Sequence, residues 1–330
     1  MTSEIPEGLS ALQSRIAGYG RSTARLHQSG IATFFGADLA DDPHPVDIGL
    51  VGLPTDAGLH QRPGARYGPR AIREASRMLR YQNVSTGVIP FELARVADIG
   101  DPDLELFGLE AIVGQIEEHY RGLRAAGVVP ITAGGDHSIT LPILRALGDG
   151  RPLALVHVDA HYDTAPPMRG SAVHHGAPVL NAVDEGVVDP TRSIQVGMRD
   201  PWAEVELLVH PEGLTALSTD EVAALGPAAV AERIREVVGD GPAYVSFDVD
   251  VIDPTMAPGT GTPVPGGLAP LDLLTMLRAL RGVDVVGADV VETSPPWDPA
   301  GMTALTAAQV MFDLLCLAAE AHAARASRRS

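Results

Sequence analysis

The fold is decided by an apolar run that ends in chemically reactive residues, PLALVHVDAHYD at 152–163. Its first half is nearly continuous in Val, Leu and Ala, which is typical of a strand buried on both faces of a sheet. Five other runs share this character and also end at turn or polar residues: VDIGLVGLP at 46–54, VVPITAGGD at 128–136, SIQVGM at 193–198, AYVSFDVD at 243–250 and VDVVGADVVE at 283–292. We therefore predict a strand in each run.

Longer segments with apolar residues at helical spacing separate these runs. They are GPRAIREASRMLR at 68–80, LEAIVGQIEEHYRGLRAAG at 109–127, SITLPILRALG at 138–148, DEVAALGPAAVAERIREVVG at 220–239, PLDLLTMLRALRG at 270–282 and a last helix at about 303–325. Such alternation predicts one three-layer α/β domain, with a mostly parallel sheet flanked by helices. We assign it to 46–325, with an N-terminal arm at 1–45 and a frayed tail at 326–330.

Composition and charge narrow the classes of partner. A chain of 330 residues with 45% apolar content can bury a large core. The net charge of -18, from 24 Lys and Arg against 42 Asp and Glu, argues against nucleic acid or an anionic membrane as partner. A small cationic substrate suits this charge, although most of it is ordinary solubilising surface.

The sequence also allows predictions about the location of the protein and the role of its cysteine. Its first residues lack the cationic start and apolar run of a secretory signal, and no segment reaches the roughly 18 uninterrupted apolar residues of a membrane helix. We expect a cytoplasmic protein. The single cysteine, Cys316, lies in the apolar stretch 307–323, which favours a buried core thiol over a nucleophile.

Four predicted strands end in polar motifs: GGDHS at 134–138, DAHYD at 159–163, DVDVIDP at 248–254 and ETSPPWD at 292–298. The carboxyl ends of parallel strands share one edge of the sheet, so these motifs should converge there. In DAHYD, the alternate residues Asp159, His161 and Asp163 form a mixed imidazole and carboxylate set that suits manganese, nickel or zinc. The alternative is a loop of helix-capping acids with an unrelated histidine.

DVDVIDP repeats this geometry with Asp248 and Asp250, whose like charges repel unless a cation lies between them. Alternatively, one of the two is protonated or caps a helix, and Asp253 belongs to the turn. His137 of GGDHS follows its strand as a further candidate ligand, although a single histidine there could be structural. Together these two histidines and four aspartates are enough for two metal ions that activate water for hydrolysis.

These motifs resemble the signature blocks of the ureohydrolase family, which includes agmatinases, arginases, guanidinobutyrases, guanidinopropionases and proclavaminate amidinohydrolases. The similarity rests on GGDHS, DAHYDT, SFDVDVIDPTMAPGTGTPVPGG, VVETSPPWD and RPGARYGPRAIR at 62–73, and it spans roughly 45–320. It implies an arginase-like fold and hydrolysis of a guanidino group to urea and an amine. Homo-oligomers, as trimers or hexamers, are implied as well.

By position, the resemblance implies roles for individual residues. Two manganese ions would be bound by His137, Asp159, His161, Asp163, Asp248 and Asp250. His175 matches a histidine that passes a proton to the departing amine, although its neighbour His174 is an alternative. Glu292 matches a glutamate that pairs with the substrate guanidinium, or it is a structural acid at a strand end. Trp297 is either core packing or a pocket wall.

The departures from the family concern the outer pocket. Arginases carry an asparagine two residues beyond the last aspartate of DAHYD, whereas this chain has Ala165, which argues against arginine as substrate. Met168 and STGVIPFE at 85–92 resemble guanidinobutyrases and guanidinopropionases, and Arg169 is a hypothetical partner for a substrate carboxylate. Met256 and the His60–Gln61 pair also depart from the family pattern. We assign RPGARYGPRAIR mainly to a turn and a helix.

The favoured prediction is a metal-dependent amidinohydrolase acting on a linear guanidino compound, either a guanidino acid such as 4-guanidinobutyrate or agmatine. A larger guanidino natural product is an alternative substrate. Two alternatives come from other classes: a non-catalytic metal-binding protein on the same fold, and a binuclear-metal hydrolase of a formimino or acyl amide.

Overall fold

The computed structural model of the chain describes residues 30–40, 42–43, 45–79, 81–105, 107–148, 150–168, 170–200 and 210–329. Most of the predicted N-terminal arm, residues 1–29, lies outside this part. So does Arg169.

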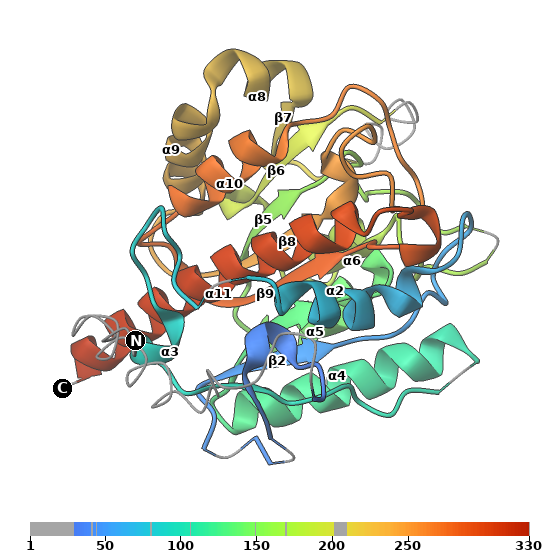
Figure 1. The fold of residues 1–330 in the computed structure, drawn as a ribbon. Helices are drawn as coiled ribbons and strands as arrows, with labels where there is room; N and C mark the ends of the chain where they lie inside the picture. Colours follow the sequence, from blue (N-terminus) through green and yellow to red (C-terminus); the bar gives the residue numbers. More distant parts are fainter. Residues whose placement is uncertain are drawn as a thin grey trace, which may run out of the picture.

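Nine parallel strands form one sheet at the centre of the described part of the protein (Figure 1). Each predicted strand is present: β2 Ile48–Gly52, β4 Val129–Ala133, β5 Ala154–Val158, β6 Ile194–Met198, β8 Pro242–Asp248 and β9 Asp284–Val291. Three short strands were not predicted, namely β1 Asp38–Leu39, β3 Val96–Asp98 and β7 Thr215–Ser218. The order across the sheet is β1-β3-β2-β4-β9-β8-β5-β6-β7. The mostly parallel three-layer α/β fold predicted from the sequence is thereby confirmed.

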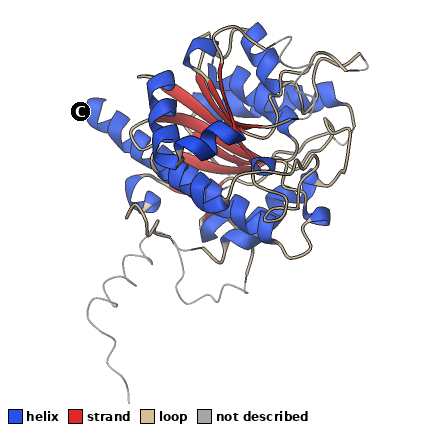
Figure 2. Ribbon diagram, turned by 90° about the horizontal axis from the view of Figure 1, so that it is seen from above, coloured by secondary structure: helices blue, strands red, loops and turns tan. Residues whose placement is uncertain are grey.

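Helices cover both faces of the sheet (Figure 2). The helices that pack in the larger core cluster are α2 Gly68–Ser76, α9 Pro227–Val238, α10 Pro270–Arg278 and α11 Met302–Arg329. Those in the cluster on the other face are α4 Leu109–Ala125, α5 Thr140–Gly148 and α6 Pro178–Asp184. The short helices α3 Pro90–Leu93 and α8 Thr219–Leu225 are the other α-helices in the described residues.

Strand β5 illustrates how one apolar run serves both layers. Ala154, Val156 and Val158 belong to the first cluster, whereas Leu153 and Leu155 belong to the second. Side chains alternate across a strand, so a strand covered on both faces needs apolar residues at nearly every position.

Helix α11 crosses one face of the sheet against β9 and α2. It is long and apolar enough to span a membrane, but 78% of its most apolar window is buried inside the protein. Cys316, which lies in this helix, is buried as predicted. These features are typical of the core helix of a compact domain.

Three details differ from the prediction. The segment 220–239 is two helices, because Gly226 has a φ of 78° and Pro227 starts a new helix at its first position. Part of the predicted arm belongs to the fold, since Phe34 and Phe35 are buried in the core. Helix α11 continues to Arg329, through most of the segment predicted as a frayed tail.

Candidate active site

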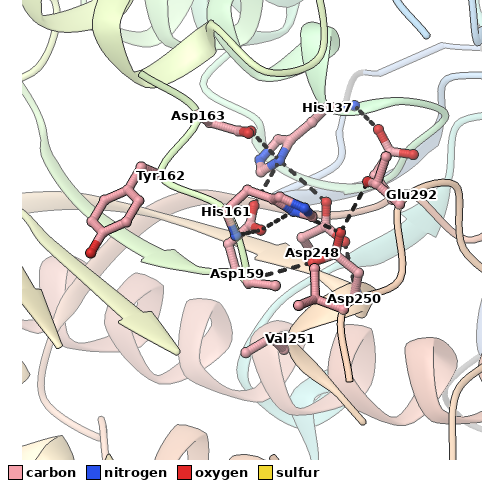
Figure 3. A network of polar contacts seen from close by, with 12 residues as sticks. His137, Asp159, His161, Tyr162, Asp163, Asp248, Asp250, Val251 and Glu292 are labelled. Atoms are coloured by element: carbon pink, nitrogen blue, oxygen red, sulfur yellow. Dashed lines mark hydrogen bonds and ion pairs between the residues drawn. The ribbon is translucent and has the colours of Figure 1, made fainter. Parts of the chain in front are cut away.

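The polar motifs converge at the carboxyl ends of β4, β9, β8 and β5, which are neighbours in the sheet. A cavity of about 380 Å³ opens at this edge. It is lined by His60, Gln61, Arg62, His161, Asp163, His175, Gly176, Asp200, Asp248, Gly261, Thr262, Pro263 and Val264. The remaining predicted metal ligands, His137, Asp159 and Asp250, are buried next to these residues (Figure 3).

One group of candidate ligands surrounds the Nδ1 atom of His137 (Figure 3). This nitrogen lies 2.8 Å from Oδ2 of Asp163, 3.1 Å from Oδ2 of Asp159 and 3.4 Å from Oδ2 of Asp248. Asp163 has a φ of 52°, a left-handed conformation that is uncommon outside glycine. Such strain is often found at functional sites, and here it turns the chain so that three carboxylates meet one imidazole.

A second group surrounds the Nδ1 atom of His161. This nitrogen lies 3.0 Å from Oδ2 of Asp250 and 3.4 Å from Oδ1 of Asp159. Asp248 accepts a hydrogen bond of 2.8 Å from the backbone nitrogen of Asp250, which fixes the two aspartates relative to each other. Asp159 belongs to both groups through its two oxygens, so it could help to hold a cation in each group.

The residues at this site fit bound cations. His137 Nδ1, Asp159 Oδ2 and Asp163 Oδ2 are buried and have no hydrogen-bond partner in the described part of the chain. Buried polar atoms are almost always paired, so unpaired acceptors that face one another indicate a missing positive charge. Both groups have the mixed nitrogen and oxygen donors that suit manganese, nickel or zinc.

The pKa values at the site support this conclusion. Burial raises the pKa of Asp248 well above its usual range, and the charges of Asp250 and Asp159 raise it further. Burial is also the main reason that the pKa of Asp250 rises to about 6. Such crowded carboxylates resist losing their protons unless a cation compensates their charge.

Further buried residues hold the ring of His137. Its Nε2 atom lies 2.8 Å from the hydroxyl of Ser246, and that hydroxyl donates a hydrogen bond of 2.6 Å to Asp289. The serine proton is directed to Asp289, so the serine oxygen accepts from Nε2–H and Nδ1 keeps its lone pair for a cation. Tyr244 and Thr140 also donate to Asp289. Such outer partners orient a metal ligand and fix its tautomer.

His157 is a site residue that we did not predict. Its Nε2 atom lies 2.9 Å from Oδ2 of Asp159, and its Nδ1 atom lies 3.0 Å from the amide nitrogen of Gln195. That amide nitrogen also donates to the carbonyl of Tyr162, so His157 Nδ1 is an acceptor and Nε2 carries the proton. His157 Nε2 therefore faces Asp159 as an N–H group at ion-pair distance, without the geometry of a hydrogen bond. The signal was its place two residues before Asp159, because such residues share one side of a strand.

Glu292 and His175 meet beside the first group. The Oε1 atom of Glu292 accepts a hydrogen bond of 2.9 Å from the backbone nitrogen of His137 and lies 3.5 Å from Nδ1 of His175. Oε2 is buried with no hydrogen-bond partner among the described residues. The φ of Glu292 is 63°, which is again a strained conformation. Burial lowers the pKa of His175, but the carboxylates of Glu292, Asp163 and Asp136 together outweigh burial and the pKa is raised.

The alternative histidine, His174, does not line the cavity in the described part of the chain. Its Nε2 atom lies 3.2 Å from the carbonyl oxygen of Pro166, and burial lowers its pKa. His175 does line the cavity. The geometry therefore favours His175 over His174, in agreement with the match to the family pattern.

Two of the residues predicted to form the outer pocket, Met168 and Trp297, do not line the cavity. Met168 is 41% exposed on a small turn, pairs through its backbone with Ser171, and is not among the described residues that line the cavity. Trp297 is 38% exposed and does not line the cavity directly, but its ring lies 4.2 Å from the guanidinium carbon of Arg62, which does. Trp297 thus supports the wall of the pocket, and Arg62 is a further residue that the sequence did not single out.

Comparison with known proteins agrees with this geometry. The model of the arginase family matches residues 46–316. The guanidinopropionase of Pseudomonas aeruginosa is 45% identical over 298 residues, covering 89% of this chain and 94% of the relative. The human mitochondrial guanidino acid hydrolase is 40% identical over 290 residues, covering 87% and 82%.

A solved structure gives the same result. The proclavaminate amidino hydrolase of Streptomyces clavuligerus superposes with a TM-score of 0.86 at 38% identity, over 90% of this chain and all of that one. A family match over most of the chain, relatives at or above 40% identity and a shared fold agree. The chain therefore belongs to the arginase family.

Proposed function

We propose that this protein hydrolyses a linear guanidino acid, such as 4-guanidinobutyrate, to urea and the corresponding amine. The observation that carries the proposal is the unpaired Oε2 atom of Glu292, which is buried behind the cavity-lining His175 and beside a cluster of unpaired cation ligands. A guanidinium is planar and cationic, and a carboxylate can bind two of its N–H groups. Substrate and cations are thereby held within reach of each other.

We propose two manganese ions as the cofactor, held by His137, Asp159, His161, Asp163, Asp248 and Asp250. Nickel and zinc accept the same donor atoms, and we regard them as alternatives. When bound, such ions lower the pKa of water and offset the charge that develops on a tetrahedral carbon.

The protein's own residues perform the remaining steps. Glu292 holds the guanidinium in a fixed orientation, which lowers the entropic cost of reaching the transition state. His175, whose Nδ1 atom lies 3.5 Å from Oε1 of Glu292, is close to a guanidinium bound there. An alkylamine must be protonated to leave at neutral pH, and we assign that proton to His175.

The choice of a guanidino acid over agmatine rests on Arg62. Its guanidinium is stacked 4.2 Å over the ring of Trp297 and lines the cavity. Within the described residues it is the only arginine or lysine at the cavity wall. A positive charge here attracts a carboxylate tail and repels the ammonium tail of agmatine.

Urea release from metal-reconstituted protein tests this proposal. The panel is agmatine, 4-guanidinobutyrate, 3-guanidinopropionate, arginine and guanidine, with urea and amine both quantified. We expect one of the two guanidino acids to be the best substrate. If agmatine were the best substrate, the role assigned to Arg62 would be wrong, but hydrolysis of a guanidino group would still be supported. No urea from any compound, with metal bound, would point to a larger guanidino substrate or a non-catalytic protein.

We further propose a cytoplasmic homo-oligomer, either a trimer or a hexamer. Cell fractionation tests the location, and light scattering of the purified protein tests the assembly. A monomer at micromolar concentration would contradict the second proposal.

A further inference from the structure

His60 lies at the mouth of the cavity in direct contact with His175. The Nδ1 atom of His60 is 2.5 Å from Nε2 of His175, and the two ring centroids are 4.7 Å apart. The backbone nitrogen of His175 also donates a hydrogen bond of 3.2 Å to the carbonyl oxygen of Gly58, two residues before His60. The turn that carries His60 is thus tied to the strand-end loop that carries His175.

The two rings differ in exposure and continue inward to a third group. His60 is exposed, whereas His175 is buried. The second nitrogen of His175, Nδ1, faces Glu292 at 3.5 Å. The order from solvent to the interior is therefore His60, His175 and the carboxylate assigned to the substrate guanidinium. An imidazole can take up a proton at one nitrogen while it releases one from the other.

We propose that His60 is a positioning residue that supplies protons to His175, so that the two imidazoles form a relay between solvent and the leaving amine. This inference rests on the proposed function. As the C–N bond breaks, its electron pair goes to the amine nitrogen, which takes a proton from Nδ1 of His175. Nε2 of His175 takes the Nδ1 proton of His60, and Nε2 of His60 takes a proton from solvent.

The overall reaction balances without another reagent. A guanidinium and one water give urea and an alkylammonium, so the amine nitrogen gains two protons, equal in number to those that the water loses. One proton is released to solvent when water is activated and one is taken up when the amine departs. The relay therefore has no net consumption of protons in a turnover.

The charges around the pair favour movement of a proton inward. Burial and the neighbouring His175 and His174 rings lower the pKa of His60, with His161 acting in the same direction and Glu292 opposing it. Burial lowers the pKa of His175 as well, but Glu292, Asp163 and Asp136 outweigh it and raise that pKa. A proton shared by the two rings is thus held more strongly by the inner one.

Two variants of His60 distinguish a proton relay from a purely structural role, in which His60 would only support His175. In His60→Gln, the amide can still hydrogen-bond to His175 but cannot relay a proton. In His60→Ala, the space left can admit free imidazole from the buffer. His322→Gln is the matched control, because His322 is a partly exposed histidine near the C-terminal end of α11, 4.0 Å from Asp47 just before β2.

We expect both His60 variants to lower kcat by about tenfold with little change in KM, since proton transfer contributes about 10²–10⁴-fold in total. The control should be unchanged. Added imidazole should restore activity to His60→Ala and not to His60→Gln. Full kcat in His60→Gln, or no rescue of His60→Ala, would overturn the relay.

A readout without turnover keeps the inference separate from the proposed function. The rate of carbethoxylation of His60 by diethylpyrocarbonate, followed by peptide mass spectrometry against pH, reports the pKa of His60. In metal-loaded His175→Ala, the midpoint should shift upward, because one source of the lowered pKa is gone. An unchanged midpoint would overturn the pairing even if urea is released. If no panel compound is hydrolysed, the proposed function fails and this result alone decides the pairing.

Discussion

The backbone nitrogen of His137 donates a hydrogen bond of 2.9 Å to Oε1 of Glu292. The residues are 155 positions apart in the sequence. They meet because β4 and β9 are neighbours in the sheet, and the backbone nitrogen of Glu292 donates in turn to the carbonyl oxygen of Gly135. One hydrogen bond thus joins the first candidate metal ligand to the candidate guanidinium-binding carboxylate, and a second joins Glu292 to Gly135, two residues before that ligand.

Glu292→Gln should separate substrate binding from metal binding. The amide can still accept from His137 but lacks the charge that balances a guanidinium. We expect kcat/KM to fall by about 10- to 100-fold, since hydrogen bonds to charged groups contribute about 1.5–3 kcal/mol. Metal content, measured by elemental analysis, should stay at the wild-type value. Loss of metal would mean that Glu292 is a ligand.

His175→Ala should slow departure of the amine. General acid catalysis typically contributes about 10²–10⁴-fold, so we expect kcat to fall by about 100-fold or more while bound metal is unchanged. The raised pKa of His175 implies that its acid form persists to higher pH than in an ordinary histidine. His174→Ala is the control, and it should keep most of the activity. If His174→Ala lost more activity than His175→Ala, His174 would be the proton donor instead of His175.

Arg62→Met should change selectivity more than chemistry. Methionine can keep the apolar contact with Trp297 while removing the charge at the cavity wall. We expect kcat/KM for the guanidino acids to fall by about 10- to 100-fold and that for agmatine to stay or rise. Steady-state kinetics on both substrate types provide the ratio. An equal loss for both would indicate that Arg62 only shapes the wall.

Asp253→Asn should weaken the fold without removing metal. Asp253 accepts hydrogen bonds from Thr255, Gly266 and Gly267, and the bonds from Thr255 contribute most to lowering its pKa to about 2. Because the pKa of Asp253 is lower in the folded than in the unfolded protein, its ionised carboxylate stabilises the fold at any pH above the pKa of the unfolded state. This contribution is lost as the pH falls from about 4 to 2. We expect the variant to lose about 1 kcal/mol of unfolding free energy at neutral pH.

The difference in unfolding free energy between the wild-type protein and Asp253→Asn should become smaller as the pH is lowered. Chemical denaturation at pH 7 and near pH 3 measures it. A constant difference across this range would mean that the charge of Asp253 does not contribute.

The central strands of the sheet could be predicted from the sequence because they are buried on both faces and are therefore continuous apolar runs. Strand β7 was missed because it is half-buried along its length, and β1 and β3 have only two and three residues. The six predicted metal ligands meet because each lies at or just after the carboxyl end of a parallel strand. Topology alone carries such residues to one edge.

The supporting residues depend on contacts between distant segments, which no local pattern contains. Ser246 holds His137 across 109 positions, and His60 meets His175 across 115. Arg62 depends on Trp297, whose ring forms its platform. Residues of this kind look like ordinary strand or turn residues until the sheet order is known.

Titration of metal-free protein with Mn²⁺, with bound manganese and urea release measured on the same samples, tests the central claim most directly. We predict that urea release from the best guanidino acid is absent without metal and reaches its maximum at two bound ions per chain. Asp250→Ala should bind fewer than two and release little urea. Full activity at one bound ion per chain, or activity in protein shown to be free of metal, would contradict a binuclear hydrolytic site.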